Sequence, residues 1–116
     1  MEQNTLALLT VSFLVVFVVY TQIKKGANKK KVRAAIDAGA VILDVRTPSE
    51  YSGGHIEGAL NIPMDSLAKK SGKIGGKDTV VVVYCASGSR SSAAVGILRN
   101  AGFTVVLNAG GIANLL

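Results

Sequence analysis

An apolar, β-branched run stops at a cysteine within residues 80–98, VVVVYCASGSRSSAAVGIL. Cys85 is the only cysteine of the 116-residue chain, and four small or polar residues and Arg90 separate it from a helix-forming segment. This order predicts a strand, a tight loop and a helix N-terminus. A loop at such a junction aims backbone N–H groups at one point, where they favour negative charge. The segment is therefore expected to hold its sulfur in an anion-binding cradle.

Cys85 is the candidate nucleophile of this segment. The thiolate is the reactive form of cysteine, and a thiol in a cradle beside Arg90 is expected to lose its proton more easily than a free thiol. A lone cysteine at the end of a buried strand is more commonly a small apolar residue packed in a core. The loop of small residues that follows Cys85 favours the first interpretation, an activated sulfur nucleophile.

An uncharged apolar run near the N-terminus sets the domain organisation. Residues 6–23 provide 18 positions, close to the shortest helix that crosses a bilayer, and no amphipathic face suggests a core helix instead. About 80 residues remain for a domain, enough for a modest core that folds alone. We predict a short tail at 1–5, a transmembrane helix at 6–23, a basic juxtamembrane linker at 24–31 and one domain at 32–116.

The formal net charge of +6 is concentrated ahead of the domain. Residues 1–34 carry six basic side chains against Glu2, a balance of +5, whereas residues 35–116 carry seven basic and six acidic ones, a balance of +1. Nucleic-acid binding needs the excess on the folded domain, with aromatic stacking residues, so no such partner is expected. The segment Lys24–Arg33 is expected to contact anionic lipid head groups, with residues 6–23 in the lipid bilayer.

The charges around residues 6–23 also predict orientation. No lysine or arginine precedes the run and no A-x-A-like site follows it, which disfavours a cleaved signal peptide. Because the basic residues follow the run, the positive-inside rule predicts a single-pass membrane protein with its domain in the cytoplasm, in the inner membrane if the protein is bacterial. A signal peptide with an exported domain is the alternative. A single cysteine permits no intrachain disulfide, which suits a reducing compartment.

Short apolar runs alternate with helical patterns in the domain. Strands are expected at 41–45, 59–62, 79–84 and 104–107, with a short helix from Pro48, another at 67–70 capped by Asp65, and one that ends before Gly102. The alternation predicts an α/β fold, a parallel sheet with helices on both faces, after one transmembrane helix. Ligands of such sheets bind outside the carboxyl ends of the strands, where Cys85 falls.

Seven short motifs stand in one order along the predicted domain: Asp44-Val45-Arg46, Glu50-Tyr51, Gly54-His55-Ile56, Gly58-Ala59, Asn61-Ile62-Pro63, Cys85–Arg90 and Gly110-Gly111-Ile112. On these motifs the chain resembles the rhodanese-like sulfurtransferases, in particular small single-domain rhodaneses of the phage-shock type. The resemblance implies a rhodanese-like sheet and thiosulfate sulfurtransferase activity through a cysteine persulfide. It also implies two small partners, an anionic sulfane-sulfur donor and a thiophilic acceptor such as cyanide or a thiol. No metal site and no cofactor is predicted.

The loop chemistry and the resemblance together assign roles around Cys85. The residues between Cys85 and Arg90 are small enough for the loop to curl around the sulfur, so their backbone amides should supply most of the stabilisation. These substrate-binding residues are Ala86, Ser87, Gly88 and Ser89. Arg90 is expected to bind the sulfonate-like end of the donor. Arg46 and Ser91 are secondary candidates. Arg46 and Glu50, one helical turn apart, are expected to pair with each other or to brace the loop, with Arg46 near the sulfur as a further possibility, and Ser91 is expected to cap the helix.

Two other functions are weighed against sulfur transfer by an enzyme. Cysteine-dependent phosphatases resemble this arrangement but place five residues between cysteine and arginine. Four residues separate them here, which suits a single sulfur atom better than a phosphate.

The main alternative is a membrane-tethered sulfur carrier or binding module with little turnover of its own. Family members usually continue beyond the Gly-Gly-Ile segment with a longer helix, often bearing a tryptophan. This chain has no tryptophan and ends at Leu116, so a very short closing helix is expected.

Overall fold

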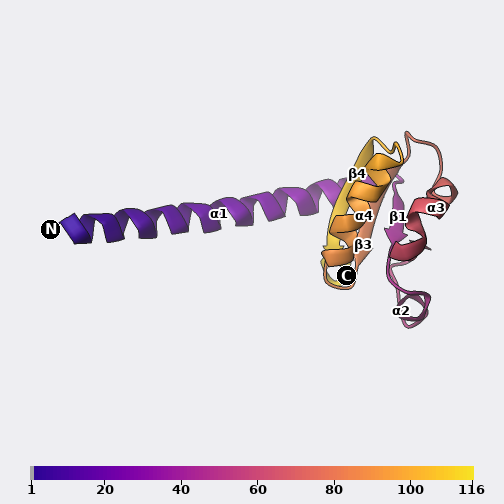
Figure 1. The fold of residues 1–116 in the computed structure, drawn as a ribbon, viewed down its shortest axis with the longest axis horizontal. Coiled ribbons are helices and arrows are strands. Elements are labelled where there is room, and N and C mark those ends of the chain that lie inside the picture. The colour runs from indigo at the N-terminus through magenta and orange to yellow at the C-terminus, as the bar shows by residue number, and fades with distance from the viewer. Residues whose placement is uncertain (1) are drawn as a thin grey trace. The chain divides into compact units, whose positions relative to one another are not determined.

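The computed structural model of the protein describes residues 2–116, with the side chains of all of these except residues 2, 3, 23–25 and 27. The helices are α1 (Glu2–Asp37), α2 (Pro48–Ser52), α3 (Leu67–Lys70) and α4 (Ser89–Asn100) (Figure 1). The strands are β1 (Val41–Asp44), β2 (Leu60–Asn61), β3 (Val80–Cys85) and β4 (Val105–Gly111). Short 3-10 helices are formed by Met64–Ser66, Ser71–Lys73 and Ile112–Leu115.

The chain divides into two compact units, one reaching to Lys30 and the other spanning Lys31–Leu116. In the first unit, the segment Asn4–Gln22 of α1 is long enough and apolar enough to cross a membrane. The hydroxyl groups of Thr10 and Thr21 each donate to a backbone carbonyl of the preceding turn, at 2.8 Å. Such a helix satisfies its own polar groups, as lipid surroundings require.

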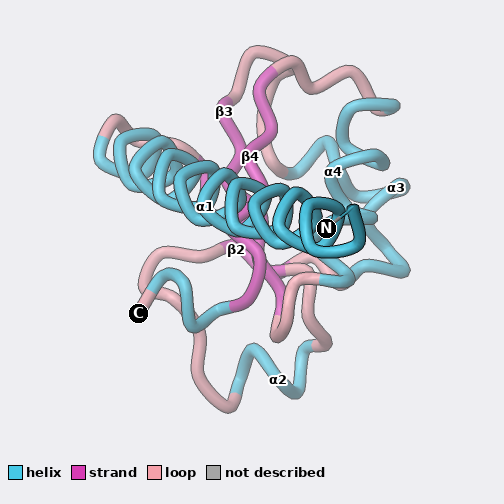
Figure 2. Tube along the Cα trace, turned by 90° about the vertical axis from the view of Figure 1, so that its left-hand side faces the viewer, coloured by secondary structure: helices cyan, strands magenta, loops and turns pink. Residues whose placement is uncertain are grey.

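Four parallel strands form the sheet of the second unit, in the order β2-β1-β3-β4. Figure 2 shows the strands in the middle of this unit, with helices and loops around them. The chain moves from β1 to β2 on one side and later reaches β3 on the other, so the direction of strand addition reverses between β1 and β3. The parallel α/β sheet predicted from the sequence is confirmed.

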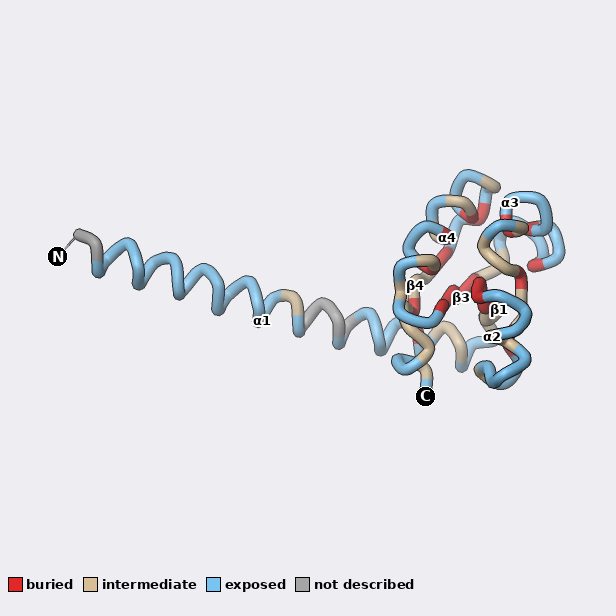
Figure 3. Tube along the Cα trace, turned by 60° about the horizontal axis from the view of Figure 1, so that its bottom comes forward, coloured by how far each residue is buried: buried red, intermediate tan, exposed pale blue. Residues whose placement is uncertain are grey.

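Helices cover both faces of the sheet, as predicted. On one face, Leu98 of α4 belongs to a buried apolar cluster with Val83 and Cys85 of β3. On the other face, Val32 from the last turns of α1 belongs to a second cluster with Tyr84. The alternation of strand side chains between the two faces places Cys85 on the α4 side. Figure 3 shows buried residues along β1 and β3, the two central strands.

Two local predictions need correction. Asp65 does not cap α3, because it lies inside the 3-10 helix Met64–Ser66 and no side chain caps α3 at Ser66. Strand β4 does not end at Leu107 but continues to Gly111, paired with β3 as far as Cys85 through a register shift. The expected short closing helix is the single 3-10 turn that follows β4.

Candidate active site

Cys85 lies where α/β sheets of this kind hold their ligands. It is the last residue of β3, and β3 pairs with β1 at the point where the direction of strand addition reverses. The crevice outside the carboxyl ends of two such strands is the usual binding position. Cys85 therefore lies at the position predicted for it, outside the carboxyl ends of the strands. Its side chain is fully buried.

The loop after β3 curls back over the sulfur. The backbone N–H of Gly88 donates a hydrogen bond to Cys85 Sγ at 2.9 Å, and Ser91 Oγ lies 3.6 Å from the same atom. Gly88 has a φ of 107°, in the left-handed region that side chains other than glycine rarely adopt, and is the N-cap position of α4. A glycine at this position therefore lets the loop close into a cradle around one atom.

These contacts change the acidity of the thiol. Burial by itself raises the pKa of Cys85, because a charge is poorly solvated inside the protein. Hydrogen bonds from the Ser91 hydroxyl and from the backbone N–H groups of Ser91, Gly88 and Ser87 favour the thiolate more strongly. The net result is a pKa below the ordinary value for the thiol, the state that a sulfur nucleophile requires.

We expect alkylation of Cys85 by iodoacetamide to titrate with a midpoint below that of an ordinary free thiol, because only the thiolate reacts and rising pH forms it. Ser91→Ala removes the hydroxyl group whose hydrogen bond with the sulfur lowers the pKa of Cys85, so it should move the midpoint upward. Ser92→Ala is the matched control, since the Ser92 hydroxyl also bonds the Gly88 carbonyl (3.0 Å) without a contact to the sulfur. The measurement is the alkylation rate against pH for the full chain in non-ionic detergent. Equal midpoints for the two variants would contradict the role of Ser91.

The end of β4 supports the cradle from behind. A Cβ atom on Gly111 would lie 2.8 Å from the Ala86 carbonyl oxygen and 3.3 Å from Ser87 Cα, both backbone atoms of the loop. On Gly88, a Cβ would meet Gly110 Cα at 3.6 Å, an ordinary contact distance. The loop therefore rests directly on the backbone of the Gly-Gly motif, which the sequence singled out without indicating what it touches.

Arg90 forms an ion pair with Glu50 of α2. Its two terminal nitrogens donate to the two carboxylate oxygens at 2.6 and 3.0 Å, and about a third of each side chain is exposed. This bond to Arg90, together with the backbone N–H of Thr47, lowers the pKa of Glu50 to about 2. The predicted pairing of Arg46 with Glu50 is therefore wrong, and Glu50 instead ties α2 to the first turn of α4.

Arg46 belongs to a buried polar cluster under the crevice. Its guanidinium binds the Asp44 carboxylate, with the shortest contact at 2.7 Å, and also donates to the Gly54 carbonyl at 2.8 Å. Tyr84 completes the cluster by donating to Asp44 Oδ2 at 2.7 Å. Asp44 is thus held by hydrogen bonds, as a buried carboxylate requires. Arg46 braces this cluster and, among the residues that the structure describes, makes no hydrogen bond to the Cys85 sulfur.

Ser91 is not the cap of α4, because the helix begins at Ser89 and Gly88 holds the cap position. The Ser91 side chain is buried beside Cys85 instead. The His55 ring stacks on Tyr51 with ring centroids 3.6 Å apart, and His55 Nδ1 lies 2.9 Å from the Tyr51 carbonyl oxygen. These contacts agree with a structural histidine in a turn.

Comparison with known proteins matches the arrangement to a family. The profile of the family described as rhodanese-like domain matches residues 28–116. The thiosulfate sulfurtransferase PspE of Escherichia coli (strain K12) is 38% identical over 74 residues, which cover 63% of this chain and 71% of PspE. The putative sulfur carrier protein YrkF of Bacillus subtilis (strain 168) is 34% identical over 87 residues, which cover 75% of this chain and 45% of YrkF.

A solved structure shares the fold of the second unit. A rhodanese with anions from E. coli superposes with a TM-score of 0.62 at 36% sequence identity. The match covers 66% of this chain and 91% of the E. coli chain. The long apolar helix before the domain is compatible with a membrane anchor or with a signal sequence, on its length and composition.

Proposed function

The chain belongs to the rhodanese-like family of sulfurtransferases, and on that premise we propose that it moves sulfane sulfur from thiosulfate, or a similar donor, to cyanide or a thiol acceptor through a persulfide on Cys85. The observation that carries the proposal is the position of Cys85 at the end of β3, with the Gly88 N–H 2.9 Å from its sulfur. The name of its relative PspE, a thiosulfate sulfurtransferase, supports the choice of donor.

The proposed reaction has two covalent steps. In the first, the Cys85 thiolate attacks the outer sulfur of thiosulfate and forms a new S–S bond. The S–S bond of the donor breaks, and its electron pair leaves on sulfite. In the second step, the acceptor attacks the outer sulfur of the persulfide, so cyanide becomes thiocyanate and the Cys85 thiolate returns. A covalent intermediate of this kind predicts ping-pong kinetics.

The cradle suits this chemistry because the nucleophile, the donor and the persulfide are all anionic. Convergent N–H groups stabilise such charges without reorganisation during the reaction. We assign that work to the backbone of the substrate-binding loop, residues 86–89, and a cationic contact with the donor to Arg90. Arg46 and Ser91 act secondarily, Arg46 by bracing the Asp44 cluster and Ser91 by contacting the sulfur.

Intact-mass spectrometry of the full chain in non-ionic detergent tests this function. Incubation with thiosulfate should add about 32 Da, one sulfur atom, to Cys85, and cyanide should remove it. The second candidate is a sulfur carrier, favoured by the similarity to the putative sulfur carrier protein YrkF. A carrier would gain the same mass only from a protein persulfide and not from thiosulfate. Hydrolysis of an aryl phosphate without any sulfur adduct would point to a phosphatase instead.

We further propose that residues 6–23 anchor the protein in a bilayer, with the domain on the cytoplasmic side and Lys24–Arg33 against anionic head groups. The basic residues after the span support this orientation. The exported domain of a cleaved signal peptide is the alternative. Asp78→Cys in a Cys85→Ser chain places one thiol at an exposed position. A membrane-impermeant thiol reagent should leave it unlabelled in sealed cells and label it after lysis.

A further inference from the structure

Glu50 already pairs with Arg90, the cation that the proposed function assigns to the sulfur donor. Both terminal nitrogens of the Arg90 guanidinium face the Glu50 carboxylate, at 2.6 and 3.0 Å. Arg90 is the second residue of α4, directly after the loop that curls over Cys85, so the ion pair lies beside the cradle. An incoming donor therefore meets a guanidinium already neutralised by a neighbouring carboxylate.

The charge of the sulfur donor decides how strongly the Glu50 carboxylate disfavours its binding. Thiosulfate is a dianion, whereas an organic thiosulfonate, which carries the same transferable sulfur, is a monoanion. Coulomb energy is proportional to charge, so a carboxylate beside the cradle disfavours the dianion twice as strongly on a logarithmic scale. The pair is partly exposed, and such pairs change equilibria by about five-fold or less, so a donor can compete with Glu50 for Arg90.

We propose that Glu50 is a positioning residue, an inference that rests on the proposed function. Through its ion pair with Arg90, Glu50 biases the site away from doubly charged sulfur donors and toward singly charged ones. In the part of the chain that the structure describes, the side chain of Glu50 forms hydrogen bonds with Thr47 and Arg90 but not with Cys85 or the loop residues 86–89. Its effect therefore passes through Arg90 and through its own charge.

Glu50→Gln changes the charge with little change in local structure. Glu50 is the third residue of α2, and it forms a capping box in which its side chain accepts from the Thr47 N–H and its own N–H donates to Thr47 Oγ1, both at 3.2 Å. Glutamine serves equally at this position of a capping box. The variant therefore keeps the start of α2 and removes the negative charge from Arg90.

The experiment measures kcat/KM for each donor with cyanide as acceptor, using the full chain in non-ionic detergent. In ping-pong kinetics this ratio reports only the donor half-reaction. Glu50→Gln should raise kcat/KM about five-fold for thiosulfate and about two-fold for an aryl thiosulfonate, with kcat/KM for cyanide changed less than either. Both gains should shrink as salt rises from about 0.01 to 0.5 M, because salt screens partly exposed charges.

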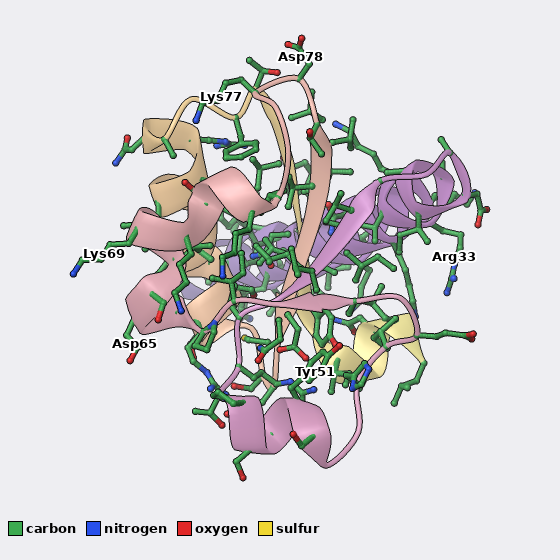
Figure 4. The ribbon with its side chains drawn as sticks, turned by 90° about the vertical axis from the view of Figure 1, so that its right-hand side faces the viewer. Arg33, Tyr51, Asp65, Lys69, Lys77 and Asp78 are labelled. Atoms are coloured by element: carbon green, nitrogen blue, oxygen red, sulfur yellow. The ribbon has the colours of Figure 1, made fainter. Side chains whose placement is uncertain are left out.

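Asp78→Asn is the matched control, since it removes one negative charge from an exposed residue. Figure 4 shows Asp78 at the opposite end of the domain from Tyr51, which follows Glu50 on α2. Asp78→Asn should change neither ratio. Equal gains for both donors, or a loss for thiosulfate in Glu50→Gln, would overturn the inference while leaving sulfur transfer intact. A wild-type chain that forms no persulfide with either donor would overturn both proposals.

Discussion

Cys85→Ser is expected to lower thiosulfate:cyanide sulfurtransferase activity by at least about 10³-fold, because serine cannot form the persulfide that carries sulfur between the two half-reactions. The change replaces one atom in a buried site, and serine is the smaller side chain, so the fold has no steric reason to change. Thiocyanate formation by the full chain measures the effect.

Two further measurements on Cys85→Ser distinguish loss of the nucleophile from loss of the fold. The thermal unfolding midpoint of Cys85→Ser should stay within a few degrees of the wild-type value, and the thiosulfate-dependent mass gain should vanish. Near-normal thiocyanate formation by this variant would exclude the persulfide mechanism, because Cys85 is the only thiol in the chain.

Gly111→Ala should have the second largest effect, a loss of about 10- to 100-fold in kcat/KM for thiosulfate. The new methyl group would stand 2.8 Å from the Ala86 carbonyl oxygen, closer than carbon and oxygen can approach, so the loop must move. Misplacement of a catalytic group by about 1 Å costs about 10² in rate. Gly111 itself has φ −78° and ψ 152°, which alanine adopts without strain, so the effect comes from the collision with the loop.

Gly96→Ala is the matched control for that prediction. It makes the same chemical change on α4, where no atom lies within 4 Å of the added methyl group. Alanine is the better helix former by about 1 kcal/mol, so this variant should be slightly more stable and as active as the wild type. Equal activity of the two alanine variants would show that the loop does not depend on its contact with β4.

Features encoded by neighbouring residues were predictable from the sequence. The run that ends at Cys85 predicted a buried strand at 79–84, and β3 is Val80–Cys85. Pro48 predicted the start of a short helix, and α2 begins there. In both cases the signal lies within a few positions: a continuous β-branched run, or a proline whose fixed φ suits the first helical turn.

Interactions between distant segments were not predictable. Spacing along the chain suggested that Glu50 pairs with Arg46, but its partner is Arg90, 40 residues away. The partner of each arginine depends on how the end of β1 and the start of α4 lie relative to one another. No local sequence pattern encodes that arrangement. Arg46 instead reaches Asp44, only two residues away, because both lie at the buried end of β1.

The end of β4 illustrates a second reason for failure. Residues 108–111, Asn-Ala-Gly-Gly, have low strand propensity, so the sequence predicted the strand only to Leu107. Pairing with the last residues of β3 holds them in the sheet, with one register shift near Tyr84. Tertiary contacts override propensity here, and the same glycines form the surface on which the active loop rests.

The complete burial of the Cys85 side chain has a consequence for how the protein responds to oxidation. A disulfide between two copies requires their Cα atoms to come within about 7 Å, which a sulfur covered by its own loop does not allow. Bulky disulfide reagents are kept out by the same burial. The covered thiol is thus protected from disulfide cross-linking between chains, whether or not its surroundings are reducing.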